Sequence, residues 1–153
     1  MGTQIIETHS YTIREASTLS GLAESTLRYY ETIGIIAPVQ RDKSSKHRIY
    51  SEDDLNTIDT VACLNATGMS LADMKKYLSN RSLGDHAPSE QLLLLEAQKQ
   101  RLKNEASFLK TQQQYVDIKI AYWRAVADSK SDEISEISDR ARALASVLKH
   151  EKR

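Results

Sequence analysis

Two adjacent side chains, Arg28 and Tyr29, are suited to hold a phosphate backbone. An arginine guanidinium pairs with two phosphate oxygens at once, and a tyrosine hydroxyl donates a further hydrogen bond. Leu27, Tyr30 and Ile33 recur at the spacing of one buried helical face, which leaves Arg28 and Tyr29 on the exposed face. The spacing of these residues predicts a short helix that packs through one face and binds a polyanion with the other.

Ser25 and Thr26 stand at the start of the same helix. Their hydroxyls suit hydrogen bonds to base edges and equally suit capping of the helix, and the sequence leaves that choice open. Upstream, residues 12–19 have the pattern of another short helix, and Gly21 supplies the tight turn between the two. Two short helices joined in this way predict a helix-turn-helix, so we expect the chain to bind DNA.

A basic run lies beyond the second helix. Five cationic or titratable side chains face only Asp42 between positions 41 and 48, and they are Arg41, Lys43, Lys46, His47 and Arg48. Alone, such a run is typical of a solvated loop. Because it follows a helix-turn-helix and leads into Ile49-Tyr50, a strand end, a DNA-gripping wing is the better interpretation.

Two more helices are expected after the wing. Ser51 caps the first, which has an acidic first turn and a predicted apolar stripe of Leu55, Ile58, Ala62 and Ala66. Thr67-Gly68 ends it, and Ser70 caps the next helix. Residues 79–88 are then predicted to be a linker, because they contain Ser79, Asn80, Ser82, Gly84, Asp85 and Pro88.

Residues 11–78 resemble the N-terminal domain of MerR-family transcriptional regulators. The matching motifs, in order, are Tyr11-Thr12-Ile13, Gly21-Leu22, Thr26 to Glu31, Ile33 to Ile36, Arg48 to Ser51, Asp54-Leu55 and Gly68 to Leu71. Ala23 departs from the family pattern because a serine or threonine helix cap usually stands there. Lys46-His47 departs where a glycine and an aromatic residue usually precede the wing arginine.

The resemblance implies a mainly α fold, with a winged helix-turn-helix DNA-binding domain, a small β wing and a long antiparallel coiled-coil dimerisation helix. It also implies double-stranded promoter DNA, a second copy of the chain and RNA polymerase as partners. The active dimer would distort an overlong promoter spacer so that polymerase engages both elements. The expected DNA-binding residues are Thr12, Ser25, Thr26, Arg28, Tyr29, Arg41, Lys43, Lys46, His47 and Arg48.

Residues 89–127 predict a coiled coil, because nine of eleven positions spaced alternately three and four apart are apolar. This seam consists of Leu92, Leu95, Lys99, Leu102, Ala106, Leu109, Gln113, Val116, Ile120, Trp123 and Ala127. A small domain cannot cover so long a seam, so we expect a homodimer in which Lys99 and Gln113 set the register. The expected dimerisation residues are Leu92, Leu95, Leu102, Ala106, Leu109, Val116, Ile120 and Trp123.

Residues 128–153 form a variable segment with apolar residues at helical spacing, and we expect it to be partly helical. It is too short for a separate drug-binding domain. The one cysteine, Cys63, resembles the lone cysteine of the MerR branch that responds to aldehydes and nitrosative stress. Two interpretations of Cys63 stay open, a thiol sensor or a small apolar residue at the margin of a packed stripe.

The remaining features exclude other classes. The four histidines are scattered and a second cysteine is missing, so no metal or other cofactor is expected. No residue pattern suggests catalysis, and an enzyme is not expected. No apolar run is long enough for a membrane span, and we expect a cytoplasmic protein. The alternative function is a coiled-coil scaffold whose winged domain has lost DNA binding, which would have no need of Arg28, Tyr29 and a basic wing together.

Overall fold

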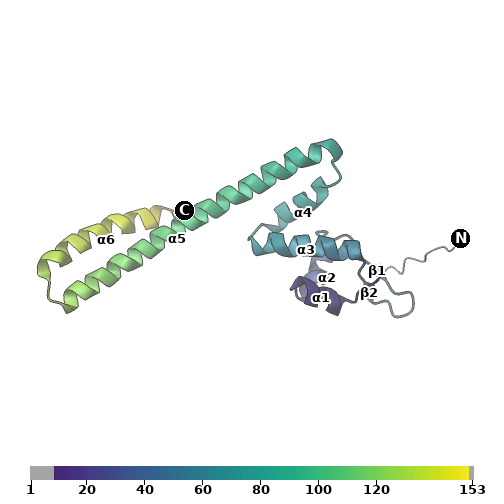
Figure 1. Cartoon of the computed structure of the whole chain (residues 1–153), viewed down its shortest axis with the longest axis horizontal. Coiled ribbons are helices and arrows are strands. Elements are labelled where there is room, and N and C mark those ends of the chain that lie inside the picture. Colours follow the sequence, from purple (N-terminus) through teal and green to yellow (C-terminus); the bar gives the residue numbers. More distant parts are fainter. Residues whose placement is uncertain (1–8, 152–153) are drawn as a thin grey trace. The chain divides into compact units, whose positions relative to one another are not determined.

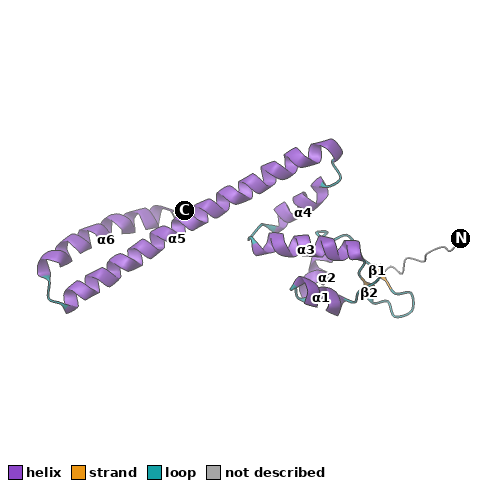
Figure 2. Ribbon diagram, viewed as in Figure 1, coloured by secondary structure: helices purple, strands orange, loops and turns teal. Residues whose placement is uncertain are grey.

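The computed structural model describes residues 9–151. The chain divides into two compact units, residues 1–94 and 95–153. Helices make up nearly all of the regular structure in the described part, and one two-stranded hairpin completes it (Figures 1 and 2). The mainly α fold with a helix-turn-helix and a small wing, expected from the sequence, is confirmed.

The helix-turn-helix consists of α1 (Ile13–Ser20) and α2 (Glu24–Thr32). A capping box starts α1: the Thr12 hydroxyl accepts the Glu15 N–H at 3.1 Å, and the Glu15 carboxylate accepts the Thr12 N–H at 3.2 Å. Gly21 ends α1 with φ of +74°, a left-handed conformation that glycine adopts without strain. The turn into α2 is therefore built from residues that favour it.

The wing is the antiparallel pair of β1 (Gln40–Arg41) and β2 (Arg48–Ile49). At its base, Tyr11 and Tyr50 exchange two backbone hydrogen bonds of 2.8 Å each. This bridge ties the residue just before the α1 cap to the end of the second wing strand. The wing and the helix-turn-helix are thus joined through their backbones.

Two helices, α3 (Glu52–Ala66) and α4 (Leu71–Asn80), follow the wing. Ser51 and Ser70 cap them through hydroxyls that each accept an N–H at 3.1 Å. The predicted stripe of α3 was partly wrong, because Ile58 and Val61 are buried while Ala66 is exposed. Val61 lies one turn from Ile58 and removes more apolar surface from water than an alanine can.

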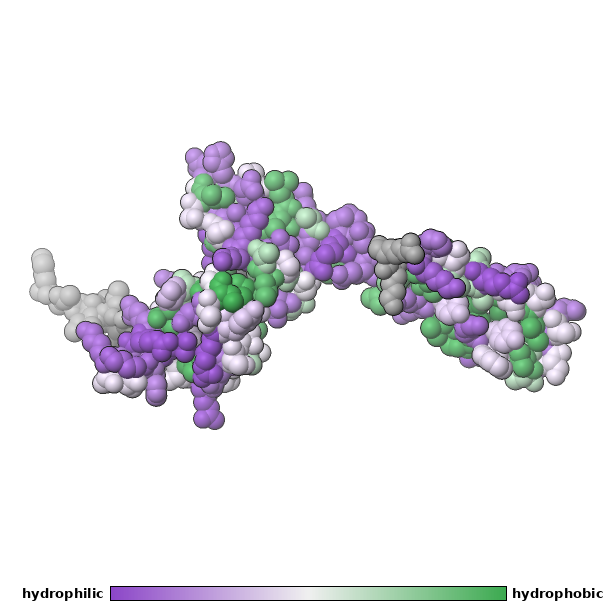
Figure 3. All heavy atoms as spheres, turned by 180° about the vertical axis from the view of Figure 1, so that it is seen from behind, coloured by the Kyte–Doolittle hydropathy of each residue, from purple (hydrophilic) through white to green (hydrophobic). Residues whose placement is uncertain are grey.

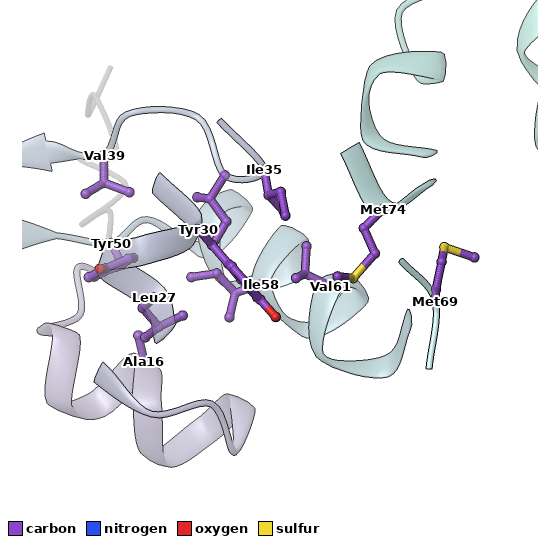
Figure 4. Packing of buried hydrophobic residues seen from close by; sticks show 11 residues of the cluster. Ala16, Leu27, Tyr30, Ile35, Val39, Tyr50, Ile58, Val61, Met69 and Met74 are labelled. Atoms are coloured by element: carbon purple, nitrogen blue, oxygen red, sulfur yellow. The ribbon is translucent and has the colours of Figure 1, made fainter. Parts of the chain in front are cut away.

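The core of this unit gathers side chains from α1 to α4 and the wing (Figure 4). Its buried members are Ala16, Leu27, Tyr30, Ile35, Ile36, Val39, Tyr50, Ile58, Val61, Met69 and Met74. Tyr30 from α2 and Ile58 from α3 lie near the middle of the group in Figure 4. The buried face of α2 is thereby fixed against α3, which determines what its outer face presents.

The segment expected as a linker, residues 79–88, is shorter in the structure. Helix α4 continues through Asn80, a 3₁₀ turn η1 occupies Gly84–His86, and α5 begins at Ala87. Pro88 belongs to the first turn of α5, where its missing N–H breaks no helical hydrogen bond. Asn80 is buried and donates to the Gln91 side chain at 3.0 Å, which bridges α4 and α5 across the connection.

The second unit contains the greater part of α5 (Ala87–Ala127) and the whole of α6 (Ser131–Glu151). The C-terminal segment is therefore more helical than expected, and residues 152–153 lie outside the described part. Helix α6 turns back alongside α5 (Figure 1). The residues of α5 that are covered there recur four and three apart, and they are Thr111, Tyr115, Ile118, Tyr122 and Ala125. Helix α5 thus has two stripes, of which the sequence analysis found only the seam.

Candidate nucleic-acid interface

The outer face of α2 carries Arg28 and Tyr29, both exposed as expected from helical spacing. The Arg28 Nη2 lies 3.2 Å from Glu24 Oε2 in an exposed ion pair one turn away, a contact that water and salt weaken. On the inner face, Tyr30 is buried and its hydroxyl donates to Asn65 Oδ1 of α3 at 3.4 Å. The packed inner face therefore holds an arginine and a tyrosine out toward solvent.

The first turn of α2 presents two hydroxyls. Ala23 is the N-cap and provides no side-chain hydrogen bond, so neither Ser25 nor Thr26 caps the helix. Ser25 is exposed and Thr26 is half-buried, and among residues 9–151 neither hydroxyl has a hydrogen-bond partner. The geometry leaves both hydroxyls available to a ligand that approaches the helix N-terminus.

The wing loop is organised by the Asp42 carboxylate. Its Oδ1 accepts the Ser45 N–H at 2.7 Å, the Ser44 hydroxyl at 2.7 Å and the Ser44 N–H at 2.9 Å. These hydrogen bonds, led by the one from the Ser45 backbone, hold the pKa of Asp42 well below its usual range. Although Asp42 opposes the basic charge of the wing, it shapes the loop that carries that charge.

Lys46 lies at the wing tip with φ of +63°, the left-handed region that glycine favours. Its N–H donates to the Asp42 carbonyl at 2.9 Å, and its own carbonyl accepts Arg41 Nη1 at 3.1 Å. Lys46 therefore adopts the left-handed conformation at a position where the family that the sequence resembles usually has a glycine. The tip gains an exposed cation at the cost of backbone strain.

Arg48 differs from the other basic residues of the wing. Lys43, Lys46 and His47 are exposed, whereas the Arg48 side chain is only 18% exposed and its Nε lies 3.4 Å from Glu31 Oε2. The same carboxylate oxygen accepts the Val39 N–H at 3.4 Å. Arg48 was expected among the DNA contacts. In the structure it forms an ion pair that links the wing to α2.

Glu31 was missed by the sequence reasoning as a functional residue. Its position one turn after the buried Leu27, on the same side of α2, was the available signal. Thr12, also expected among the DNA contacts, has its hydroxyl engaged in the α1 capping box. Of the other expected DNA contacts, Thr26 is half-buried, and the exposed ones are Ser25, Arg28, Tyr29, Arg41, Lys43, Lys46 and His47.

Cys63 lies on α3 and its side chain is exposed. The interpretation as a small packed residue at the margin of the stripe is therefore not supported by its burial, whereas a reactive thiol requires access to solvent. Among residues 9–151, no group of three or more histidine, cysteine or acidic side chains is arranged to hold a metal ion. No helix in that range is long and apolar enough to cross a bilayer.

A separate candidate interface runs along α5. All eleven seam positions are exposed, including Leu109 at 59% and Trp123 at 65%. Helix α6 covers the other side of α5, and Tyr115, Ile118 and Tyr122 are half-buried there. Hydrophobic side chains lie among hydrophilic ones on the surface of the α5–α6 pair (Figure 3).

Comparisons with known proteins place these features in context. Residues 11–81 match the family model described as MerR HTH family regulatory protein. An uncharacterized HTH-type transcriptional regulator of Haemophilus influenzae is 31% identical over 115 residues, which are 75% of this chain and 84% of that protein. The HTH-type transcriptional regulator AdhR of Bacillus subtilis is 37% identical over 82 residues, 54% of this chain and 58% of AdhR.

Solved structures are similar as well. HiNmlR, described as a MerR family regulator lacking the sensor domain and bound to promoter DNA, aligns with a TM-score of 0.64 at 29% identity. The alignment covers 84% of this chain and 96% of HiNmlR. A MerR family protein of Listeria monocytogenes aligns with a TM-score of 0.64 at 28% identity, over 85% of this chain and 98% of that one. The similarity to these two structures thus extends well beyond the helix-turn-helix.

Proposed function

This chain belongs to the MerR family of helix-turn-helix regulatory proteins, and we propose that it acts as a homodimer on a pseudo-palindromic promoter operator. As a family member it is a DNA-binding transcriptional regulator. The observation that carries the proposal is the exposed pair Arg28 and Tyr29 on a helix whose other face is fixed in the core. Regulation of this kind takes place in the cytoplasm, where the promoter is.

In the proposed complex, the N-terminus of α2 enters the major groove. Ser25 and Thr26 then reach base edges, since their hydroxyls are not used in capping. Arg28 and Tyr29 bind the adjacent phosphates, and the wing cations Lys43 and Lys46 bind the flanking backbone. Glu31 and Arg48 position the wing relative to α2 through their ion pair.

Two heads in one dimer would contact half-sites separated by about one helical turn or more of DNA. We propose that the bound dimer distorts the spacer between promoter elements so that RNA polymerase engages both. HiNmlR, whose structure contains promoter DNA, supports a promoter as the target. Bent DNA would then be the output of the regulator.

The experiment that tests this function is selection of bound fragments from the source genome, followed by footprinting. We expect enriched fragments to contain an inverted repeat within a promoter, protected on both half-sites by one dimer. Circularly permuted fragments should migrate as bent DNA when bound. Fragments with one isolated half-site, or no enrichment over random DNA, would contradict the proposal.

We further propose that Cys63 is the sensor of aldehydes or oxidants. Its exposed thiol lies on α3, which packs against both α1 and α4, so an adduct there could shift elements that hold α2. Cys63→Ser should keep operator affinity and lose the transcriptional response to these reagents. Cys63→Ala serves as the second variant, and full induction in a strain carrying it would remove Cys63 from the sensing mechanism.

A further inference from the structure

Tyr50 carries a buried hydroxyl that the fold does not use. Its side chain is 1% exposed, and among residues 9–151 this hydroxyl is the one buried side-chain polar group without a hydrogen-bond partner. A buried polar group without a partner costs free energy, and a phenylalanine in the same place would avoid that cost. The hydroxyl therefore points to a second arrangement of the wing in which it has a partner.

Two charged side chains lie near this hydroxyl. Arg48 stands two residues before Tyr50, so both side chains project from the same face of the extended wing segment. Glu31 stands one turn after Leu27 on α2, and Leu27 belongs to the same buried cluster as Tyr50 (Figure 4). Burial raises the pKa of the Tyr50 hydroxyl, the charge of Arg48 lowers that pKa, and the charge of Glu31 raises it. The hydroxyl thus lies within electrostatic reach of both members of the ion pair.

The ion pair between Arg48 and Glu31 is open to exchange. Arg48 Nε lies 3.4 Å from Glu31 Oε2, which is longer than the roughly 2.7–2.9 Å of a strong charge-assisted hydrogen bond. A phosphate can accept two guanidinium N–H groups at once, so DNA competes with Glu31 for Arg48. Without Arg48, the Glu31 carboxylate, only 14% exposed, would keep the Val39 N–H as its remaining donor in the described part. Such a buried, poorly paired charge is costly and needs a replacement donor.

We propose that Tyr50 is a positioning residue for DNA binding, whose hydroxyl donates to Glu31 when Arg48 moves from that carboxylate to a DNA phosphate. The inference rests on the DNA contacts proposed above and adds the group that makes Arg48 available to them. The ion pair positions the wing as the chain meets DNA, and the Tyr50 hydroxyl then keeps Glu31 tied to the end of β2. Arg48 changes its partner while the wing stays attached to α2.

Urea denaturation of the full chain tests the hydroxyl without DNA. In the wild-type background, Tyr50→Phe should leave the urea midpoint unchanged or raise it, because it removes an unpaired hydroxyl. Arg48→Met keeps the apolar length of the side chain and removes the cation, so Glu31 should accept the Tyr50 hydroxyl in the free chain. Tyr50→Phe should therefore lower the midpoint in the Arg48→Met background. The same change of midpoint in both backgrounds would overturn the proposal.

DNA binding provides a second test, which leaves Arg48 in place. Anisotropy with a random-sequence duplex at low salt should show that Tyr50→Phe binds about fivefold more weakly for each subunit engaged, the factor that corresponds to one hydrogen bond. In a Glu31→Gln background the same change should have no effect, because a neutral amide forms no ion pair from which Arg48 must be released. Tyr30→Phe is the matched control and should bind as wild type does, since the buried Tyr30 hydroxyl already has Asn65 as its partner.

The outcomes separate this inference from the function on which it rests. Wild-type affinity in Tyr50→Phe, or an equal loss of affinity in the Glu31→Gln background, would overturn the role of Tyr50 alone. A loss in Tyr30→Phe as large as that in Tyr50→Phe would do the same, because core packing would then account for both. A wild-type chain that fails to bind the duplex would instead overturn the DNA contacts themselves.

Discussion

At the scale of single residues, the wing tip combines a functional charge with an unfavourable backbone. Lys46 has φ of +63°, which costs a non-glycine residue roughly 1 kcal/mol. Lys46→Gly should therefore raise the free energy of unfolding by about 0.5 kcal/mol, once the greater unfolded-chain entropy of glycine is subtracted. The same change removes a cation and should weaken DNA binding. Chemical denaturation and fluorescence anisotropy measure the two effects.

Lys43→Gly is the matched control for that substitution. Lys43 is exposed in the same loop and lies outside the left-handed region, so glycine there relieves no strain. It should reduce DNA affinity to a similar extent while lowering the free energy of unfolding by about 0.5 kcal/mol. Stability changes of the same sign in both variants would contradict the strain at Lys46.

Asp42 should make the wing loop dependent on pH only in strong acid. Its hydrogen bonds lower the folded-state pKa below the ordinary 3.8, so the carboxylate stabilises the loop at every pH above 3.8. This stabilisation is lost as the pH falls below 3.8 through the folded-state value. The amide NMR signals of Ser44 and Ser45 should accordingly stay in place between pH 7 and pH 4.

Asp42→Ala removes the carboxylate that accepts the hydrogen bonds from Ser44 and Ser45. The Ser44 and Ser45 amide signals should then move toward random-coil positions at neutral pH. Unchanged signals in this variant would show that the backbone alone holds the loop. The Ser44 and Ser45 amide signals of the wild-type chain at pH 7 are the reference for this comparison.

The exposure of single residues was predictable from the sequence, whereas their long-range contacts were not. The spacing of Leu27 and Tyr30 was enough to place Arg28 on the outer face, because one helix determines both faces. The ion pair of Arg48 with Glu31 was not predictable, since it depends on how a loop returns to a helix 17 residues earlier. Local periodicity carries no information about such a long-range contact.

At the scale of elements, α2 begins without a side-chain cap. Ala23 occupies the N-cap with extended φ and ψ, the conformation in which a serine hydroxyl accepts an N–H of the first turn. Ala23→Ser should raise the free energy of unfolding by about 1 kcal/mol, as measured by urea denaturation. Ala23→Val, which cannot cap, is the control and should give no gain. Equal stability of the serine and alanine forms would contradict this account of the helix start.

Helix boundaries were predictable wherever a local signal fixes them. Ser51, Ser70 and Gly21 each stand at the helix end that their chemistry favours. The expected linker failed at Pro88, because proline both ends helices and occupies their first turn. The second stripe of α5 was overlooked because Thr111, Tyr115 and Tyr122 are weaker apolar signals than the leucines of the seam.

At the scale of the whole molecule, the proposed homodimer depends on the seam of α5. Leu109→Glu would bury an unpaired carboxylate in the dimer and should yield monomers by light scattering. Leu93→Glu is the matched control, since Leu93 is 63% exposed against 59% for Leu109 but lies outside the seam. The control should remain dimeric. If both variants are dimers, the seam is not the interface.

The order of elements follows from local patterns along one chain, whereas a dimer depends on a surface that two chains share. The stripe around Ile118 is covered and the seam around Val116 is exposed, although both lie on the same helix. That difference becomes visible only when α6 is seen alongside α5 (Figure 1).

The central claim is that the outer face of α2 binds DNA phosphates, and the salt dependence of binding tests it most directly. Affinity for an operator fragment is measured by anisotropy over a range of salt concentrations for wild type, Arg28→Ala and Arg142→Ala. Arg142 is the matched control, an exposed arginine of α6 that is also paired with a carboxylate of its own helix.

Loss of one phosphate contact in each subunit should flatten the slope of log affinity against log salt by about 2 for Arg28→Ala. Its affinity for operator and for random DNA should fall together, while Arg142→Ala matches wild type. A correctly folded Arg28→Ala dimer with the wild-type slope and affinity would contradict the account.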